Sequence, residues 1–498
     1  MSRNAWSVVW NLVVGVRCTI VACVVSCCAA QTATVVAGET ANRPNFIVVV
    51  ADDLGYGDLA CYGNSRIRTP NLDRFSTQGV RLTQYYSPAP VCSPARAGLL
   101  TGRTPQRVGI HHVVAPGSPM YLPKSEITIA TLLKNEAGYT TALCGKWHLN
   151  GHFNEPDHPQ PGDHGFDYWF ATQNNASPSH QDPDNFVRNG KPVGPLKGFS
   201  ALIVADEAVS WLRNQRDQER PFFLYVCFHE PHEPIATDKQ FTEQYPGAEP
   251  SLAAHHGNIS QMDEAFGRIM RAVDELGLTD QTLVWFVSDN GPALSRQHPH
   301  GSAGPLRENK GQLYEGGIRV PGIIRWPGRI AAGTTSDEPV CGVDLLPTFC
   351  EIVGIKPPAD RAIDGTSILP LFAGQPIQRT VPLYWQNNFA RTAPKVAMRE
   401  GDWKILATVD GPQLHPTDIT AERIRTIKTA PLLRFELYNL HNDVGETTDL
   451  ANQEPQRLQA MAAKLQAMYR QIQQETPGWP EWKDPRPIGR RARNSQPD

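Results

Sequence analysis

The chain contains one stretch that decides its fold, Asn45-Phe46-Ile47-Val48-Val49-Val50-Ala51-Asp52-Asp53. Its run of apolar, mostly β-branched residues predicts a strand that is buried on both faces, as in a parallel sheet. The two aspartates at the C-terminal end of this strand lie where open α/β sheets bind their ligands. Because adjacent carboxylates repel each other, a divalent cation would compensate their charge, although a solvated acidic turn before Gly55 would also explain the pair.

Strands and helices alternate along the chain that follows. Further buried strands are predicted at 140–143, 221–228, 282–287 and 322–326, and helices at 93–101, 129–137, 202–213, 259–276 and 344–353. The alternation between residues 45 and about 372 predicts a doubly wound α/β/α sandwich around a large mixed sheet. From about Pro382 the pattern changes to a hairpin over 396–406, a strand over 435–440 and a terminal helix over 454–473.

A cysteine stands directly before the helix predicted at 93–101. Ser93 and Pro94 are typical of a helix start, with Ser93 as the cap, and Gly102 can close the helix in a left-handed conformation. Cys92 would therefore lie at a helix N-terminus, which favours an anion, and Arg96 would add a cation one turn later. A buried cysteine before an ordinary helix is the alternative for this motif taken alone.

The sequence around this cysteine resembles the signature of a known enzyme family. Cys92-Ser93-Pro94-Ala95-Arg96, followed by Leu99-Leu100-Thr101-Gly102-Arg103, is similar to the motif of the type I sulfatases of the alkaline phosphatase superfamily. Further motifs follow the family's order as far as about residue 352, and the rest of the chain fits the family's C-terminal part. The resemblance implies that a formylglycine-generating maturation enzyme oxidises Cys92 to Cα-formylglycine.

The resemblance also implies a calcium site, with magnesium as the less favoured ion. The strand predicted at 282–287 ends in Ser288-Asp289-Asn290-Gly291, which by itself is a good turn sequence. Together with the first aspartate pair, this segment matches the two halves of the family's calcium site. The implied ligands are Asp52, Asp53, Cys92, Asp289 and Asn290.

Basic and imidazole side chains complete the implied site. Lys146 and His148, two residues apart near the end of a predicted strand, would project toward the same side. They lie in a segment that resembles the family's sulfate-contacting motif, although Asn150 replaces the glycine of many members. The resemblance implies the catalytic set Cys92, Arg96, Lys146, His148, His232 and Lys310, of which the last four would also bind the substrate's sulfate. His232 or Lys310 would protonate the leaving group.

A long polar segment, 172–190, is the predicted sugar-binding element. Loops of this length often carry function, although solvation alone could explain its composition. Its Asn174, Asn175 and His180 offer directional hydrogen bonds that suit sugar hydroxyls. We therefore expect substrate selection to depend on this segment.

The activity that the resemblance implies is the hydrolysis of sulfate esters. Hydrated formylglycine would attack sulfur, and its second hydroxyl would then expel sulfate and restore the aldehyde. The run 357–365 resembles the arylsulfatase A and N-acetylgalactosamine-6-sulfatase branch, which implies an O-sulfate on a galactose or N-acetylgalactosamine unit of a sulfated polysaccharide. The alternatives are a formylglycine-dependent phosphonate or phosphate monoester hydrolase and an inactive homologue that binds sulfated glycans.

The predicted organisation has five parts. Residues 1–30 read as a secretory signal peptide, 31–44 as a linker, 45–380 as the catalytic domain, 381–482 as a smaller domain with an antiparallel sheet and a helix, and 483–498 as a flexible tail. The leader predicts export to the periplasm, the exterior or a lumenal compartment. A lipoprotein anchor at Cys27 is the alternative.

The composition excludes several other classes of protein. With 47 basic and 50 acidic residues the formal net charge is −3, so the chain carries no bulk signal for nucleic-acid binding. Beyond the leader, no segment is apolar enough to predict a membrane span. Six cysteines follow the leader without the spacing of a metal finger, and neither a disulfide pairing nor an oligomeric state is predicted.

Overall fold

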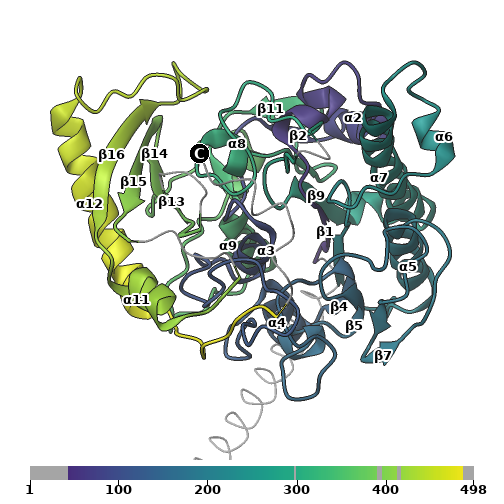
Figure 1. The fold of residues 1–498 in the computed structure, drawn as a ribbon. Coiled ribbons are helices and arrows are strands. Elements are labelled where there is room, and N and C mark those ends of the chain that lie inside the picture. The colour runs from purple at the N-terminus through teal and green to yellow at the C-terminus, as the bar shows by residue number, and fades with distance from the viewer. Residues whose placement is uncertain (1–42, 296–298, 390–394, 412–416, 486–498) are drawn as a thin grey trace, which may run out of the picture.

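A ten-stranded sheet forms the centre of the molecule in the computed structural model, which describes residues 43–295, 299–389, 395–411 and 417–485 (Figure 1). The strand order is β11-β2-β10-β9-β1-β8-β4-β5-β6-β7. The predicted signal peptide, Cys27 and nearly all of the predicted linker and tail lie outside the described residues.

The middle of this sheet is parallel. It consists of β9 (Thr282–Ser288), β1 (Asn45–Ala51), β8 (Phe222–Cys227), β4 (Thr140–Lys146) and β5 (Tyr168–Thr172). The outer strands are β2 (Val80–Leu82), β6 (Val187–Arg188), β7 (Lys191–Pro192), β10 (Gly322–Arg325) and β11 (Thr334–Ser336). Because β10, β6 and β7 pair in antiparallel fashion, the sheet is mixed, as predicted. A separate short pair joins β3 (Tyr85–Tyr86) to β12 (Val340–Cys341).

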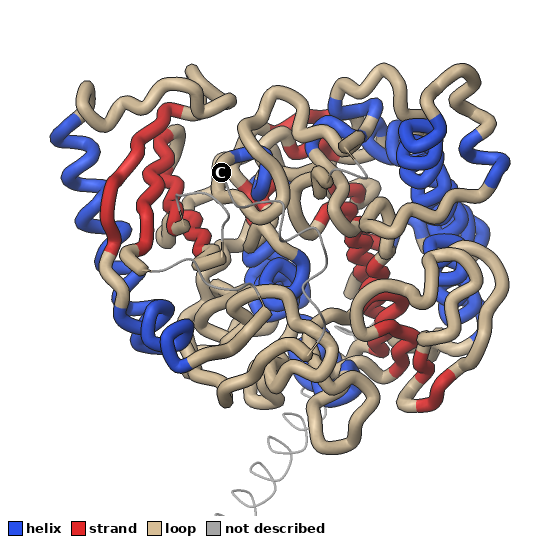
Figure 2. The backbone as a smooth tube through the Cα atoms, in the orientation of Figure 1, coloured by secondary structure: helices blue, strands red, loops and turns tan. Residues whose placement is uncertain are grey.

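Helices cover both faces of the large sheet, because alternate residues of β1 point to opposite sides. Phe46 and Val48 belong to a buried cluster with α3 (Cys92–Thr101), α4 (Ile129–Ala137) and α9 (Leu345–Val353). Ile47 and Val49 belong to a second cluster with α2 (Pro70–Thr77), α5 (Ser200–Asn214) and α7 (Pro250–Glu275). Figure 2 shows these helices on the two sides of the red strands, which confirms the doubly wound sandwich.

A small antiparallel sheet lies at the other side of the molecule, at the left of Figure 1. Its strands, in order, are β13 (Leu383–Gln386), β14 (Val396–Glu400), β15 (Trp403–Val409) and β16 (Leu432–Asn439). One face packs against α12 (Pro455–Glu475) through residues such as Ile405 and Leu465. The other face packs against the large unit, where Trp385 and Leu406 meet Tyr86 and Ile318. The predicted combination of an antiparallel sheet and a terminal helix is confirmed.

Four short α-helices and five 3₁₀ helices complete the described part of the fold. The α-helices are α6 (Lys239–Thr242), α8 (Glu315–Ile318), α10 (Leu369–Phe372) and α11 (Ala421–Thr429). Among the described residues, no helix is long and apolar enough to cross a membrane. The six described cysteines are free thiols, five of them buried.

The structure corrects several predicted boundaries. Helix α3 begins at Cys92 with Val91 as its cap, so the prediction of Ser93 as the cap is wrong. Ser93 Oγ instead accepts a hydrogen bond from the N–H of Val114 at 2.9 Å. Strand β4 extends to Lys146, and α7 begins at Pro250, nine residues before its predicted start. Helix α11 was not predicted from the sequence, because most of its residues are polar.

Candidate active site

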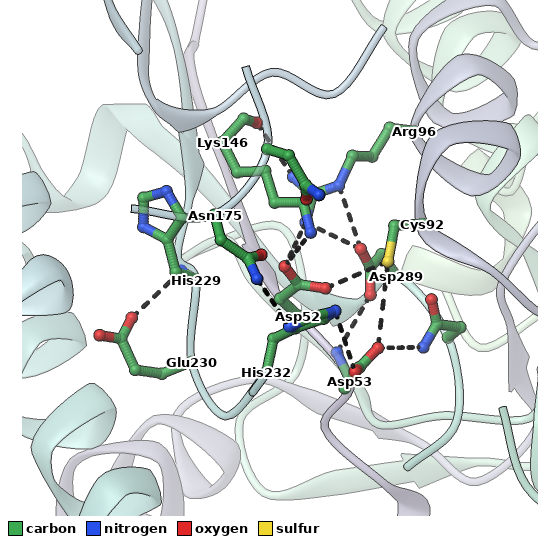
Figure 3. Close-up of polar contacts among 12 residues, drawn as sticks. Asp52, Asp53, Cys92, Arg96, Lys146, Asn175, His229, Glu230, His232 and Asp289 are labelled. Atoms are coloured by element: carbon green, nitrogen blue, oxygen red, sulfur yellow. Dashed lines mark hydrogen bonds and ion pairs between the residues drawn. The ribbon is translucent and has the colours of Figure 1, made fainter. Parts of the chain in front are cut away.

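The C-terminal ends of the parallel strands bring most of the predicted site residues together (Figure 3). Because these strands run in one direction, their ends meet at one edge of the sheet. The residues that meet there are Asp52 and Asp53 after β1, Lys146 at the end of β4, His232 after β8, Asp289 and Asn290 after β9, Cys92 and Arg96 on α3, and Lys310 from the segment before α8.

Two residues of α3 contact carboxylates from different strands. The thiol of Cys92 donates to Asp52, with 3.3 Å between Sγ and Oδ1. Arg96 donates from Nε and Nη2 to Oδ2 of Asp289, at 3.0 and 2.8 Å, and from Nη1 to the carbonyl of Lys146 at 3.1 Å. Because all of these side chains are buried, α3 has a fixed position relative to the strand ends.

Two lysines and a histidine contact the aspartate pair. Lys146 Nζ lies 2.5 Å from Oδ2 of Asp52, and Lys310 Nζ lies 2.6 Å from Oδ1 of Asp53. His232 Nε2 lies 3.6 Å from Oδ2 of Asp53. Each aspartate therefore has its own lysine partner, and His232 lies nearer to Asp53.

The backbone at the site adopts conformations that are uncommon outside glycine. Asp53 has φ of 68° and His148 has φ of 58°, and such local strain is typical of functional sites. Gly145 has φ of 109°, and a Cβ there would lie 1.8 Å from the carbonyl oxygen of Cys227 on the next strand. A glycine before Lys146 is therefore required for β4 to pair closely with β8.

Burial and neighbouring charges act on the acidic groups in different ways. Burial alone would raise the pKa of Asp52, but Lys146, His232 and Arg96 hold it well below its usual range. Burial, and then the charge of Asp52, raise the pKa of Asp289 to about 7. The same two causes raise the pKa of the Cys92 thiol, which is opposite to the shift that activates cysteine nucleophiles.

The histidines and the second lysine differ in charge at neutral pH. Burial lowers the pKa of both His148 and His232, and the nearby charges of Lys146 and Lys310, respectively, lower it further. Burial opposes the charge of Lys310, but Asp53 raises its pKa above the usual value. The site therefore combines neutral imidazoles with a charged ammonium group.

The oxygen donors of this site fit a hard divalent cation. Asp52, Asp53, Asp289 and Asn290 are all buried, and the Oδ1 of Asn290 has no hydrogen-bond partner among the described residues. Possible ligand atoms of Asp52, Asp53, Cys92 and His232 lie within 4.8 Å of one another. Carboxylate and amide oxygens are the donors that calcium and magnesium prefer, and a cation would relieve the repulsion among three carboxylates. The residues present therefore fit the ion that the resemblance implies.

The predicted sugar-binding segment contacts this site through the side chain of Asn175. Asn175 Nδ2 lies 3.3 Å from His232 Nδ1. Asn174 is half-buried, and its Oδ1 has no hydrogen-bond partner within the described part of the chain. His180 is 0% exposed, and its ring centroid lies 5.5 Å from that of His229. The structure thus brings Asn175 to the site and places His180 against His229, while sugar binding by all three asparagine and histidine residues stays a prediction.

Two buried residues that the sequence patterns did not single out hold the turn after β8. Glu230 accepts a hydrogen bond from the hydroxyl of Ser200 at 2.5 Å, and its carbonyl accepts the N–H of Asp52 at 3.0 Å. Thr172 Oγ1 lies 2.8 Å from Nε2 of His229. Burial raises the pKa of Glu230 to about 7. A carboxylate two residues beyond the apolar strand predicted at 221–228 was the available signal for Glu230, whereas Thr172 had none.

Comparison with known proteins identifies relatives over most of the chain. The sequence model of the family described as Sulfatase matches residues 44–355, and that of the N-sulphoglucosamine sulphohydrolase C-terminal region matches residues 308–414. N-acetylgalactosamine-6-sulfatase of Rattus norvegicus is 38% identical over 69% of this chain and 68% of its own length. Arylsulfatase A of Homo sapiens is 34% identical over 87% of this chain and 89% of its own length. The crystal structure of Ps i-CgsB in complex with k-i-k-neocarrahexaose has a TM-score of 0.73 and 27% identity, over 87% of this chain and 94% of the other.

Proposed function

Because the chain belongs to the sulfatase family and is a sulfuric ester hydrolase, we propose that it removes the O-sulfate from a galactose or N-acetylgalactosamine unit of a sulfated polysaccharide. The reaction would use Cα-formylglycine at position 92 and a calcium ion. One observation carries this proposal: Cys92, at the first turn of α3, directs Sγ to within 3.3 Å of Asp52 in a cluster of buried carboxylates and cations.

Position 92 is the proposed nucleophile after maturation. A formylglycine-generating enzyme, with an external oxidant, would replace the thiol of Cys92 by an aldehyde oxygen. When hydrated, this group supplies the hydroxyl that attacks the sulfur of the ester. The raised pKa of the unmodified thiol supports the need for this conversion, because the thiol would be a poor nucleophile.

Cationic side chains would bind the sulfate and stabilise the charge that develops on it. The ammonium groups of Lys146 and Lys310 contact Asp52 and Asp53, respectively, so both would be within reach of a sulfate bound beside the aspartate pair. Arg96 and His148 would contribute to the same cradle. His232 Nδ1 lies 2.5 Å from the carbonyl of Glu233, which requires the proton on Nδ1 and leaves Nε2 as an acceptor. This tautomer favours Lys310 over His232 as the proton donor to the leaving oxygen.

The calcium ion would be held by the oxygens of Asp52, Asp53, Asp289 and Asn290, together with the side chain at position 92. When bound, it would balance the charge of the sulfate and lower the pKa of the attacking hydroxyl. Removal of Arg96 would disturb this arrangement, because Arg96 orients the proposed ligand Asp289 through two hydrogen bonds.

The proposed sugar comes from the names of the relatives. The rat relative acts, by its name, on N-acetylgalactosamine 6-sulfate, and the structural neighbour was crystallised with an oligosaccharide. Asn174 and Asn175, on the segment that reaches His232, offer amide groups to a sugar beside the sulfate.

A substrate panel tests the proposal. Purified enzyme would be assayed on defined sulfated galactose and N-acetylgalactosamine oligosaccharides, on a small aryl sulfate, and on matched aryl phosphate and phosphonate esters. We expect the highest kcat/KM with a sulfated galactose-type unit. Faster turnover of the phosphate or phosphonate esters would support the alternative hydrolase, and no turnover of any ester would support a protein that only binds glycans.

Two cysteine variants test the nucleophile. Cys92→Ala should remove nearly all turnover, whereas Cys350→Ala, at a buried cysteine of α9 distant from the site in sequence, should retain it. Mass spectrometry of the peptide that contains position 92 should detect the aldehyde or its hydrate. An active preparation with only an unmodified thiol at this position would refute the mechanism.

Export and domain organisation are part of the same proposal. Identification of the N-terminal residue of the mature protein would distinguish removal of residues 1–30 from anchoring through Cys27. The start of β13 at Leu383, after the last helix of the large unit, supports a boundary near 380 between a catalytic domain (45–380) and a smaller domain (381–482).

A further inference from the structure

A loop beside the candidate active site gathers two histidines and a glutamate. His152, Glu155 and His158 each offer a possible ligand atom, and these atoms lie within 4.8 Å of one another. None of the three belongs to the site described above. The loop follows directly on the segment that carries Lys146 and His148.

One side chain organises the backbone of this loop. The Nε2 of Gln160 lies within hydrogen-bond distance of the carbonyls of His152, Glu155 and His158, at 3.2, 3.0 and 2.9 Å, and its two N–H groups are shared among these three acceptors. Its Oε1 accepts the N–H of Asn154 at 2.8 Å. The three candidate ligands are therefore tied to a common centre, so little loop entropy remains to be lost when an ion binds.

The side chains already approach one another on the outer face of the loop. His152 Nδ1 lies 2.9 Å from Oε2 of Glu155. The rings of His152 and His158 are stacked, with centroids 4.3 Å apart and planes 20° apart. The Nδ1 of His158 is buried without a hydrogen-bond partner among the described residues, so this nitrogen lacks the contact that a buried polar atom requires. The side chains of His152 and Glu155 are 28% and 60% exposed, which leaves room for water on an ion.

We propose that His152, Glu155 and His158 form a second metal site that binds one divalent transition-metal ion, with Zn²⁺ as the best fit. Two imidazole nitrogens and one carboxylate, completed by water, are a donor set that zinc accepts in tetrahedral geometry. Calcium prefers six to eight oxygen ligands, whereas two of the three side chains gathered here offer imidazole nitrogens. The site is thus distinct in chemistry from the cluster around Asp52.

Such an ion would stabilise the loop next to the sulfate-binding residues. The N–H of His148 donates to the carbonyl of Gln173 at 2.7 Å, and Nε2 of Gln173 donates to the carbonyl of Asn150 at 3.1 Å. Asn150 in turn donates to the carbonyl of Pro159 at 2.8 Å. The loop that carries the proposed metal site is therefore connected to His148 through three hydrogen bonds.

The test is a titration of the full-length protein with Zn²⁺ by calorimetry, in buffer that contains excess calcium to fill the Asp52 cluster. The wild type should bind one more zinc ion than the double variant His152→Ala/His158→Ala. Each single histidine variant should bind this ion at least tenfold more weakly, and Gln160→Ala about 10- to 100-fold more weakly. His441→Ala removes an exposed histidine on the small domain and should bind like the wild type.

Cobalt provides a spectroscopic check on where the ion binds. Co²⁺ at two imidazoles and a carboxylate gives visible absorption without a thiolate charge-transfer band, whereas binding at a free thiol, such as Cys92 in molecules that have not been converted to formylglycine, gives that band. Glu155→Gln keeps the shape of an exposed side chain and should also weaken binding, which separates ligand loss from misfolding. Equal zinc stoichiometry and the same cobalt spectrum in the wild type and the double variant would overturn the proposal.

Discussion

The guanidinium of Arg96 donates two hydrogen bonds to a single oxygen of Asp289, from Nε at 3.0 Å and from Nη2 at 2.8 Å. Their side chains are only 1% and 0% exposed. The other carboxylate oxygen, Oδ1, accepts the N–H of Asp53 at 3.2 Å. One buried ion pair therefore connects the helix that carries position 92 to the ends of two strands.

Removal of this arginine should destabilise the protein as well as inactivate it. Arg96→Ala leaves Asp289 and Asp52 buried without their shared cation, and loss of one partner of a buried pair costs about 3–5 kcal/mol. Urea unfolding in a chelating buffer measures the loss. Arg470→Ala, at an exposed position of α12, should change stability by less than about 0.5 kcal/mol. An Arg96→Ala protein as stable as this control would contradict the role of the pair.

Calcium should stabilise the folded protein through the same cluster. An ion at 100 times its dissociation constant adds about 2.7 kcal/mol to the stability of the state that binds it. Addition of calcium should therefore raise the thermal unfolding midpoint of the wild type, and chelation should abolish turnover reversibly. Asp289→Ala should lose both responses, while Asp280→Ala, at an exposed residue, should keep them. Full turnover after complete removal of divalent ions would rule out the proposed metal.

A buried carboxyl near the site should make stability depend on pH. Asp58 accepts hydrogen bonds from the N–H groups of Gly55 and Ser302, at 2.8 and 2.9 Å, and burial raises its pKa from 3.8 to about 8. Because the folded state holds this proton more tightly than the unfolded chain, the contribution of Asp58 to stability is greatest below pH 4 and is lost as the pH rises through 8.

The slope of this loss is at most about 1.4 kcal/mol per pH unit. Unfolding free energies of the wild type should therefore fall between pH 5 and 7.5 relative to those of Asp58→Asn, which carries no titrating group at this position. Asp280→Asn, at an exposed carboxyl, should follow the wild type. Parallel pH profiles for the wild type and Asp58→Asn would show that Asp58 is ionised in the folded state.

The sequence predicts the fold well wherever the local pattern is continuous. Strand β1 is apolar on both faces, and α4 has the bounds that its amphipathic pattern predicted, with Thr128 as the cap at its start and Gly138 in the left-handed conformation at its end. The prediction failed at Ser93, because the hydroxyl bonds to Val114 on a distant loop, and no local pattern signals such a contact. The site residues at strand ends could be located from the sequence, because each follows a continuous apolar strand pattern. The orientation of His180 could not, because it depends on packing against His229.

The buried charges between the small sheet and the large unit could not be predicted from the pattern of apolar and polar residues in the sequence. Lys404 lies in a hairpin strand and resembles a surface residue in the sequence, yet it is 0% exposed. Its Nζ lies 2.9 Å from Oε1 of Glu315, on α8, and 2.9 Å from Oε1 of Glu446. This contact between distant segments holds the small sheet against the large unit.

Substitution of this lysine should separate stability from catalysis. Lys404→Met keeps most of the volume but leaves two carboxylates buried without their shared ammonium group, at a cost of about 3–5 kcal/mol. Urea unfolding measures the loss, with Lys428→Met on the exposed face of α11 as the control. At a temperature where the variant is still folded, its kcat/KM should remain close to that of the wild type. A variant with normal stability would mean that the pair of glutamates is protonated.

The last prediction separates the sulfate-binding half of the site from the sugar-binding half. In the proposed site Lys310 would face a group that every sulfate ester shares, so Lys310→Ala should reduce kcat/KM by orders of magnitude on both a sulfated oligosaccharide and a small aryl sulfate. Asn174→Ala should lose one hydrogen bond of about 0.5–1.5 kcal/mol, a several-fold effect on the oligosaccharide alone. Asn442→Ala, at an exposed residue of the small domain, is the matched control and should affect neither substrate. His180→Ala decides the role of the buried ring: a loss confined to the oligosaccharide supports sugar binding, whereas equal loss on both substrates would show that His180 supports His229 and would refute its assignment to the sugar.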